Sequence, residues 1–223
     1  CKLLGPSNVR TYSIGMEGSL DLKYARIVAK YLGTQHTEVL FTPEEGLAVI
    51  PDVIQTLESY DITTIRASVG MYLLCQYIKK NTQDRVIFSG EGSDELLCGY
   101  LYFHKAPSPE EAAFESERLV KDLYMYDVLR SDRTVSIHGL EVRVPFLDKD
   151  VVGLCMNLES TKKMPKDGWE KYILRKAFED NYIPEEILWR RKCAFSDGVS
   201  PPRDSWFSII KNYVDTLISD SEF

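Results

Sequence analysis

The sequence predicts an α/β fold, in which a parallel, doubly wound sheet is followed by a mainly helical carboxyl-terminal half. Two observations support this class. Over residues 1–100, short apolar runs alternate with stretches of helical period, the pattern of a parallel sheet covered by helices on both faces. After Tyr100, helix start signals and helical stretches take over. We therefore expect an α/β part over residues 1–100 and a mainly helical part over residues 101–223.

Three strands are predicted in the first part. They cover residues 9–15, 36–41 and 86–88, and the second is recognised by its apolar carboxyl end. Residues 86–88 form an uninterrupted apolar run, which is typical of a buried strand. Ser89 and Gly90 follow this run at the carboxyl edge of the sheet, where open α/β folds bind their ligands.

Helices are predicted between these strands. Apolar residues at helical spacing run from Leu22 until Gly33 provides a stop signal. Residues 42–45 carry a capping-box pattern with proline at the first helical position, and Pro51 interrupts or restarts the helix that follows. Residues 65–80 are expected to form another helix before the third strand.

Helix signals dominate the second part of the chain. Residues 108–111 repeat the capping-box pattern. The final residues, 218–223, are expected to fray. The helical stretches predicted in this part are residues 108–138, 148–158, 169–178 and 184–189.

Composition bounds the class of protein. The chain has 223 residues, of which 44% are hydrophobic and 27% charged, so it suits one globular domain or two small ones with a substantial core. The formal net charge of −7 argues against a basic surface that follows nucleic-acid phosphates. A local basic pocket for a small phosphorylated ligand remains compatible with that charge.

Cysteine usage and hydropathy predict a cytoplasmic protein. The five cysteines are scattered without a CxxC pair, which favours reduced thiols over a zinc or redox site. The chain starts with Cys1 and lacks an apolar signal segment. No window approaches the roughly 18 apolar residues that would span a bilayer.

The segment SGEGSDE, residues 89–95, is a candidate site. Its glycines let the backbone approach a ligand, and free amides at the following helix start attract phosphate oxygens. Glu91 and Asp94 offer carboxylates for a general base or for Mg²⁺, which prefers one or two carboxylates together with phosphate oxygens. The alternative is a glycine turn in which Ser93 or Asp94 caps a helix. The segment is not a Walker A loop, because Gly-Lys-Ser/Thr is missing.

Two further pairs admit both a functional and a structural interpretation. Thr63 and Arg66 lie three apart at a helix start and could face one phosphate, or the helix is capped and the arginine lies on the surface. Lys171 and Arg175 lie four apart and are expected on one helical face, where a basic pair is usually solvated.

The segment HGLEVRVPFLD, residues 138–148, favours a structural interpretation. Glu141 and Arg143 alternate with apolar residues, which predicts a partly buried ion pair. His138 has no partner at metal-ligand spacing, so we expect it to pack against neighbours or to lie on the surface.

Together these motifs resemble one family, the synthetase domain of glutamine-hydrolysing asparagine synthetase, over about residues 9–199. The resemblance implies an ATP pyrophosphatase fold of the adenine nucleotide α hydrolase type. It also implies that ATP and aspartate form β-aspartyl-AMP and pyrophosphate, and that ammonia then displaces AMP to give asparagine. Several blocks in the same order are more specific than any single glycine motif. The blocks are YDITTIRASVGMYL, VIFSGEGSDELLCGYLYFHKAPSPEE, HGLEVRVPFLD, GWEKYILRKAFED and WRRKCAFSDGV.

The resemblance also implies residue roles. Adenylation turns a carboxylate, a poor electrophile, into one with a leaving group, and the departing pyrophosphate carries negative charge that Mg²⁺ and basic side chains can neutralise. By motif, Ile14 would contact adenine through its backbone, and Ser89 and Gly90 would contact the nucleotide. Thr63, Arg66 and Lys171 would contact pyrophosphate, and Asp94 would bind Mg²⁺. Glu91 would be the base that deprotonates ammonia, and Asp127 and Arg130 would lie at the aspartate pocket.

One departure from the family pattern is large. The family carries a Ser-Gly-Gly-x-Asp-Ser loop that grips pyrophosphate and supplies another magnesium aspartate, and residues 1–223 contain no such segment. The chain is expected to begin just after that loop, without the amino-terminal glutaminase domain, and to be inactive by itself. Cys1 is not the nucleophile of a glutaminase domain, because CKLLGP does not match the Cys-Gly-Ile start.

The expected partners are aspartate, ammonia and the glutaminase domain of the full-length protein, and the family allows a homodimer. Nucleic acid and membrane are not expected. Two rival functions stay open: an amide-forming adenylating enzyme like β-lactam synthetase, and a shortened paralogue that acts as a non-catalytic interaction module.

Overall fold

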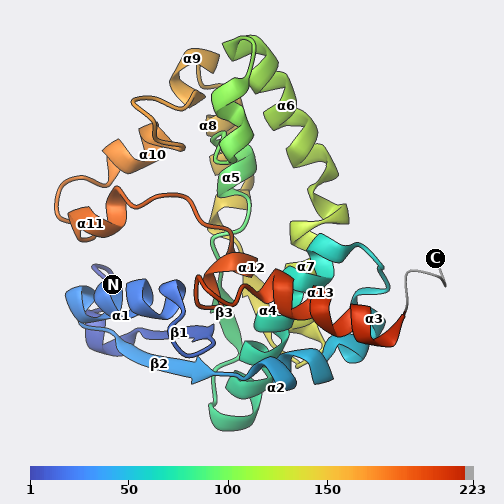
Figure 1. Cartoon of the computed structure of the whole chain (residues 1–223). Coiled ribbons are helices and arrows are strands. Elements are labelled where there is room, and N and C mark those ends of the chain that lie inside the picture. Colours follow the sequence, from blue (N-terminus) through green and yellow to red (C-terminus); the bar gives the residue numbers. More distant parts are fainter. Residues whose placement is uncertain (219–223) are drawn as a thin grey trace. The chain divides into compact units, whose positions relative to one another are not determined.

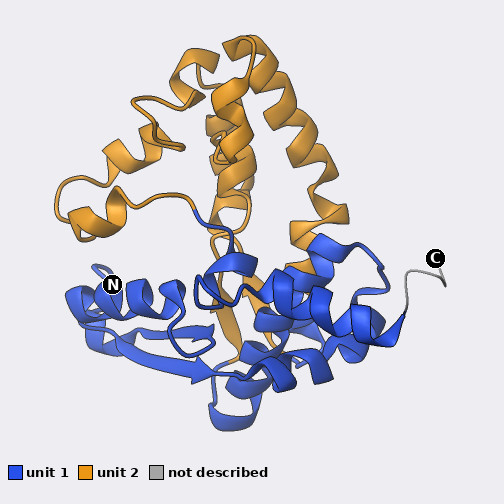
Figure 2. Cartoon of the chain, in the orientation of Figure 1, with its two compact units in different colours: residues 1–84, 133–139, 193–223 blue, residues 85–132, 140–192 orange. Residues whose placement is uncertain are grey.

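The computed structural model describes residues 1–218, and the chain divides into two compact units. Unit 1 contains residues 1–84, 133–139 and 193–223, and unit 2 contains residues 85–132 and 140–192; Figure 2 colours them separately. Both units combine segments that are distant in the sequence. These boundaries differ from the functional division expected at residue 100, which stays a prediction.

Unit 1 is built on a parallel β–α–β element. Strands β1 (Arg10–Gly15) and β2 (Gln35–Leu40) pair in parallel, with Ile14 opposite Val39. The connecting helix α1 (Leu20–Leu32) lies against both strands, as Figure 1 shows. It ends at Gly33, whose φ of 72° is left-handed, so the predicted stop signal is confirmed.

The next helices of unit 1 begin where the sequence predicts. Helix α2 (Pro43–Ala48) starts with a complete capping box: the Glu45 amide donates to Thr42 Oγ1 at 3.2 Å, and the Thr42 amide donates to Glu45 Oε2 at 2.8 Å. Helix α3 (Ile50–Leu57) restarts the chain with its proline in the first turn. Helix α4 (Ile62–Asn81) is longer than expected, because Asp61 caps it by accepting from the Thr64 amide at 2.6 Å.

Two helices that the sequence analysis missed complete the core of unit 1. They are α12 (Phe195–Gly198) and α13 (Trp206–Leu217), the second beginning with a fully buried tryptophan. Trp206 meets Phe41 edge to face, with ring centroids 6.1 Å apart, and donates from Nε1 to the Arg66 carbonyl at 3.1 Å. The expected fraying falls mostly on residues 219–223, which lie outside the described residues.

Unit 2 holds a second parallel pair, β3 (Val86–Phe88) and β4 (Glu141–Arg143). The expected burial of β3 is wrong: Phe88 is 73% exposed and Val86 48% exposed, because alternate residues face opposite sides of a strand and only the side of Ile87 is covered. Strand β4 was not predicted. The ion pair of Glu141 and Arg143 forms, but both side chains are more than half exposed, so its expected partial burial is also wrong.

The helices of unit 2 surround small apolar clusters, one formed by Leu96, Leu97 and Cys155. Helix α6 (Pro109–Asp122) begins at the predicted position, with Ser108 Oγ accepting from the Glu111 amide at 3.2 Å, which is one of the two bonds of the expected capping box. It packs against α5 (Ser93–Leu96) and α9 (Ser160–Lys163), as Figure 1 shows. The helices and 3₁₀ turns (η) of unit 2 are α5 (Ser93–Leu96), η2 (Leu101–Lys105), α6 (Pro109–Asp122), η3 (Leu123–Met125), α7 (Asp127–Ser136, which continues into unit 1), η4 (Pro145–Leu147), α8 (Lys149–Met156), α9 (Ser160–Lys163), α10 (Tyr172–Ala177) and α11 (Glu185–Leu188). Unit 1 also has η1 (Pro6–Asn8).

The α/β class and parallel pairing agree with the sequence-based prediction. The strands described within residues 1–218 form two separate two-stranded sheets, so a single doubly wound sheet is not shown. Buried free thiols occur at Cys75, Cys98 and Cys155. Over the described residues, no helix combines the length and apolar character needed to cross a membrane.

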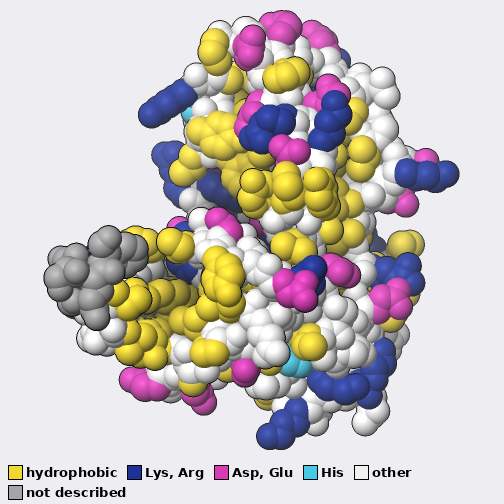
Figure 3. All heavy atoms as spheres, turned by 90° about the vertical axis from the view of Figure 1, so that its right-hand side faces the viewer, with side chains coloured by type: hydrophobic (Ala, Val, Ile, Leu, Met, Phe, Trp, Pro, Cys, Tyr) yellow, Lys and Arg dark blue, Asp and Glu magenta, His cyan; other side chains and the backbone are white. Residues whose placement is uncertain are grey.

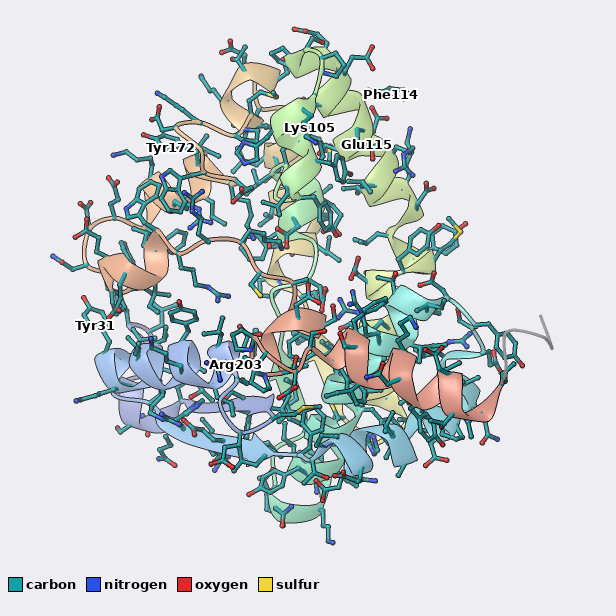
Figure 4. The ribbon with its side chains drawn as sticks, viewed as in Figure 1. Tyr31, Lys105, Phe114, Glu115, Tyr172 and Arg203 are labelled. Atoms are coloured by element: carbon teal, nitrogen blue, oxygen red, sulfur yellow. The ribbon has the colours of Figure 1, made fainter. Side chains whose placement is uncertain are left out.

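Unit 2 also exposes apolar side chains. Figure 3 shows hydrophobic side chains gathered on the face of this unit that is turned toward the viewer. On α6, Phe114 is 69% exposed and projects away from the helix (Figure 4). Tyr124 and Met125, in η3, are 65% and 40% exposed.

Candidate functional site

The turn between β3 and α5 positions the acidic side chains of unit 2. The Ser89 amide extends the ladder by donating to the Arg143 carbonyl at 2.9 Å. Gly92 has a φ of 90°, and a Cβ there would lie 2.3 Å from Leu147 Cδ2, so only glycine fits. A Cβ on Gly90 would meet nothing within 4 Å, which leaves the backbone there open to a ligand. No side chain caps α5, so the capping interpretation of this turn is wrong.

Glu91 faces a buried arginine in this unit. Its side chain is 16% exposed, and Nη2 of Arg130 lies 3.2 and 3.3 Å from its two carboxylate oxygens. The same Nη2 contacts Asp127 Oδ1 at 2.5 Å, one turn earlier on α7. Burial raises the pKa of Glu91 to about 7, although Arg130 opposes the shift. A carboxyl group with a pKa in this range is suited to accept a proton near neutral pH.

Asp94 binds two lysines. Lys171 Nζ lies 3.0 Å from Oδ1, and Lys192 Nζ lies 2.9 Å from Oδ2. Burial alone would raise the pKa of Asp94, but the two ammonium groups hold it below its usual range. Asp94 is therefore a carboxylate whose charge is balanced by two cationic side chains.

Lys171 reaches Asp94 because the backbone turns before α10. Lys171 has a left-handed φ of 51°, so this residue precedes α10 instead of belonging to it. The expectation that Lys171 and Arg175 share one helical face is therefore wrong. Arg175 instead donates from Nε to the Glu170 carbonyl at 2.8 Å and is 12% exposed. The interpretation of a solvated basic pair is wrong as well, since Lys171 is only 20% exposed.

Asp94 fits the preferences of a magnesium ion. Its Oδ1 atom is buried and accepts no hydrogen bond of good geometry, but Lys171 Nζ lies 3.0 Å from it, so a magnesium ion would take the place of that ammonium group. Magnesium is commonly held by one or two carboxylates together with substrate phosphates, so a single carboxylate from the protein is enough. Within residues 1–218, no cluster of three or more His, Cys, Asp or Glu side chains forms a self-contained metal site.

Two site neighbours were missed by sequence analysis. Lys192 stands in a basic run with Arg190 and Arg191, and nothing in the pattern separates it from them. Tyr100 follows the glycine-rich segment as one aromatic residue among several. Its hydroxyl donates to Glu95 Oε1 and lies 3.4 Å from Asp127 Oδ2. Only the fold, which returns the chain against the start of α5, reveals both.

Unit 1 contains the other predicted site residues. Ile14 lies on β1 and the whole residue is 2% exposed, so its side chain belongs to the core of unit 1. Thr63 and Arg66 lie in the first turns of α4, at a capped helix start as one interpretation expected. Arg66 is not a surface residue, because its side chain is 19% exposed and pairs with Asp197 Oδ1 at 3.2 Å.

His138 has the expected packing role. Its ring meets the ring of Tyr72 in an edge contact, with centroids 4.5 Å apart. Burial lowers the pKa of His138, which keeps the imidazole neutral against the aromatic ring.

Comparisons with known proteins identify the family to which this chain belongs. A family model described as asparagine synthase matches residues 2–118 and 107–223. The glutamine-hydrolysing asparagine synthetases of Gallus gallus and Rattus norvegicus are 56% and 57% identical over 98% and 97% of this chain. The Homo sapiens enzyme of the same description is 57% identical over 96% of it. The chain spans about 40% of the length of these relatives.

Proposed function

Because the chain belongs to the asparagine synthase family, we propose that the protein in which it occurs makes asparagine from aspartate, ATP and ammonia. The observation that carries this proposal is the acidic turn between β3 and α5. Glu91 in this turn is a buried carboxyl group with a pKa of about 7, and Asp94, three residues later, is a carboxylate bound by two lysines. We also propose the ATP pyrophosphatase fold, with its doubly wound sheet, for the complete protein.

In the first step, an oxygen of the aspartate β-carboxylate attacks the α-phosphorus of ATP. The bond from that phosphorus to the bridging oxygen breaks, so β-aspartyl-AMP forms and pyrophosphate leaves. Lys171 and Lys192 are the cations of unit 2 that can move from Asp94 to the departing negative charge. Thr63 and Arg66 of unit 1 are proposed as further pyrophosphate contacts, and Ile14 as the adenine contact.

In the second step, the ammonia nitrogen attacks the activated carbonyl carbon, and the bond to the AMP oxygen breaks. Glu91 takes the proton that the nitrogen loses, which its raised pKa favours. Arg130 contacts both Glu91 and Asp127, so it can orient the base Glu91. Asp127 and Arg130 together would form part of the aspartate pocket. Ser89 and Gly90 offer backbone atoms to the nucleotide.

Magnesium would be held by Asp94, a carboxylate whose Oδ1 atom accepts no hydrogen bond, and would neutralise phosphate charge. We further propose a cytoplasmic location and ammonia supplied from glutamine by an amino-terminal glutaminase domain. A homodimer stays a prediction from the family.

Isotope exchange between ATP and pyrophosphate tests this function. A protein of the relatives' full length should exchange labelled pyrophosphate into ATP only when aspartate and Mg²⁺ are present. Release of ADP and phosphate would indicate a kinase-like site instead. Exchange with a carboxylate substrate other than aspartate would favour the β-lactam synthetase type, and a melting temperature that ATP and Mg²⁺ do not change would favour a non-catalytic module.

A further inference from the structure

Tyr100 contacts two groups of side chains in unit 2: its hydroxyl contacts Glu95 and Asp127, and its ring contacts Lys192, a partner of Asp94. A tight turn at Cys98, whose φ is 51°, and Gly99 returns the chain to the start of α5. The Gly99 amide donates to the Asp94 carbonyl at 2.8 Å, and a Cβ on Gly99 would lie 2.0 Å from Asp94 Oδ1. This close approach requires glycine and fixes the tyrosine that follows against the acidic side chains.

The hydroxyl of Tyr100 connects to Glu91 through other side chains. It donates to Glu95, which is 3% exposed, and lies 3.4 Å from Asp127 Oδ2. The other oxygen of Asp127 contacts Arg130, and Arg130 contacts Glu91 at 3.2 Å. The hydroxyl therefore stands at the end of a connected polar chain that reaches Glu91.

The ring of Tyr100 contacts Lys192, the lysine that pairs with Asp94. Lys192 Nζ lies 5.6 Å from the ring centroid, within the range of a cation–π interaction, and 2.9 Å from Asp94 Oδ2. The ring also stacks on Tyr102, with centroids 5.9 Å apart and planes inclined by 5°. Stacking on Tyr102 and the contact with Lys192 both restrict the orientation of the ring.

We propose that Tyr100 is a positioning residue for both steps of the reaction: its hydroxyl holds Glu95 beside Asp127 and Arg130, the neighbours of Glu91, and its ring holds Lys192 beside Asp94. This role rests on the proposed function. The hydroxyl serves the ammonia step, because it leads to the base. The ring serves adenylation, because it places a cation near the site of pyrophosphate departure.

The two roles are separable by substitution. Tyr100→Phe removes the hydroxyl and keeps the ring, whereas Tyr100→Leu removes both. Tyr102→Phe is the matched control: its hydroxyl also donates to a carboxylate, Glu115 on α6 at 2.9 Å, and Figure 4 labels that glutamate. Glu115 has no contact with Glu91, Asp94 or their partners among the interactions described for unit 2.

The experiment uses a protein of the relatives' full length and measures pyrophosphate exchange, ammonia-dependent asparagine formation and melting temperature on the same samples. Tyr100→Phe should lower the ratio of asparagine formation to exchange by about 10- to 100-fold, the range for a displaced supporting contact, with exchange near that of the unsubstituted protein. Tyr100→Leu should lower exchange as well. Tyr102→Phe should leave both rates unchanged.

The ratio of the two rates does not depend on the folded fraction, so it separates positioning from stability. The role of Tyr100 is overturned if Tyr100→Phe leaves the ratio of asparagine formation to exchange unchanged, including the case in which both rates fall equally. It is also overturned if Tyr102→Phe lowers that ratio as much as Tyr100→Phe does. These outcomes leave the proposed function itself intact. If the unsubstituted protein shows no aspartate-dependent exchange, the proposed function fails and this role fails with it. Poor folding of Tyr100→Phe leaves the ratio measurable on its soluble fraction, and an unchanged ratio in Tyr100→Leu then overturns the role.

Discussion

At the scale of single residues, Glu91 and Lys171 should give opposite kinetic signatures, because they serve different charges along one reaction. Lys171→Ala should slow adenylation by about 10² to 10³, the range for one electrostatic donor, so exchange and asparagine formation both fall. Glu91→Gln keeps the size of the side chain but cannot accept a proton, so asparagine formation should fall by about 10² to 10⁴ and exchange by less.

Exposed residues of α6 provide the controls for this comparison. Glu117 and Lys121 form an ion pair at 2.7 Å and are 55% and 70% exposed, so Glu117→Gln and Lys121→Ala remove the same groups from solvated positions. Both controls should keep full activity. A Glu91→Gln protein with a lower melting temperature but normal turnover per folded molecule would falsify the catalytic role.

The pKa of Glu91 also sets a pH dependence. At a fixed concentration of unprotonated ammonia, asparagine formation should rise as the pH increases through about 7, because the deprotonated carboxylate is the base. Glu91→Gln should lose this rise. Stability changes in the opposite direction: since the folded state binds the proton more tightly, the contribution of Glu91 is present below its ordinary pKa of 4.5 and is lost as the pH rises through about 7. Equilibrium unfolding at pH 5 and pH 8 measures it.

At the scale of elements, the two glycines of the turn before α5 should respond differently to alanine. Gly92→Ala should lower the free energy of unfolding by about 2 to 4 kcal/mol, because a left-handed φ and an overlap with Leu147 both oppose a Cβ. Gly90→Ala meets no atom within 4 Å and should change stability by less than about 0.5 kcal/mol, while it can still impair nucleotide contact. Denaturant unfolding of both variants decides; equal losses would contradict the assignment.

The elements also show how far sequence reasoning reaches. Local signals located α1, α2 and α6, because a glycine stop or a capping side chain acts within one turn and needs no distant partner. Strand β4 was missed because its three residues become a strand only by pairing with β3 from a distant part of the chain. Helix α13 was missed although it is amphipathic, and its buried Trp206 is understood only through the unit 1 core.

The same distinction applies to the candidate site. The family resemblance located Glu91, Asp94, Arg130 and Lys171, and the structure pairs Arg130 with Glu91 and Lys171 with Asp94 within unit 2. Contacts made through a backbone reversal were not readable from the pattern, which is why the left-handed turn at Lys171 contradicted the expected helix. Lys192 and Tyr100 were invisible for the same reason.

At the scale of the whole molecule, the relation between this chain and its longer relatives gives the last prediction. Residues 1–223 contain no Ser-Gly-Gly-x-Asp-Ser segment, which the family resemblance makes the main grip on pyrophosphate. Loss of a single oxyanion donor costs about 2.7 to 4 kcal/mol, or about 10² to 10³ in rate, and a phosphate-binding loop supplies several such donors. We therefore expect the chain by itself to make asparagine more than about 10³-fold more slowly than a protein of the relatives' length, even with ammonia in excess.

The comparison needs both proteins at verified mass, assayed for ammonia-dependent asparagine formation at the same concentration of folded molecules. Circular dichroism and a melting transition establish that the shorter chain is folded, so that a low rate reports a missing grip and not an unfolded protein. Asparagine formation by the shorter chain at a rate comparable to the longer protein would contradict the prediction. It would mean that Lys171 and Lys192, both ion-paired with Asp94, hold pyrophosphate without help from any loop outside residues 1–223.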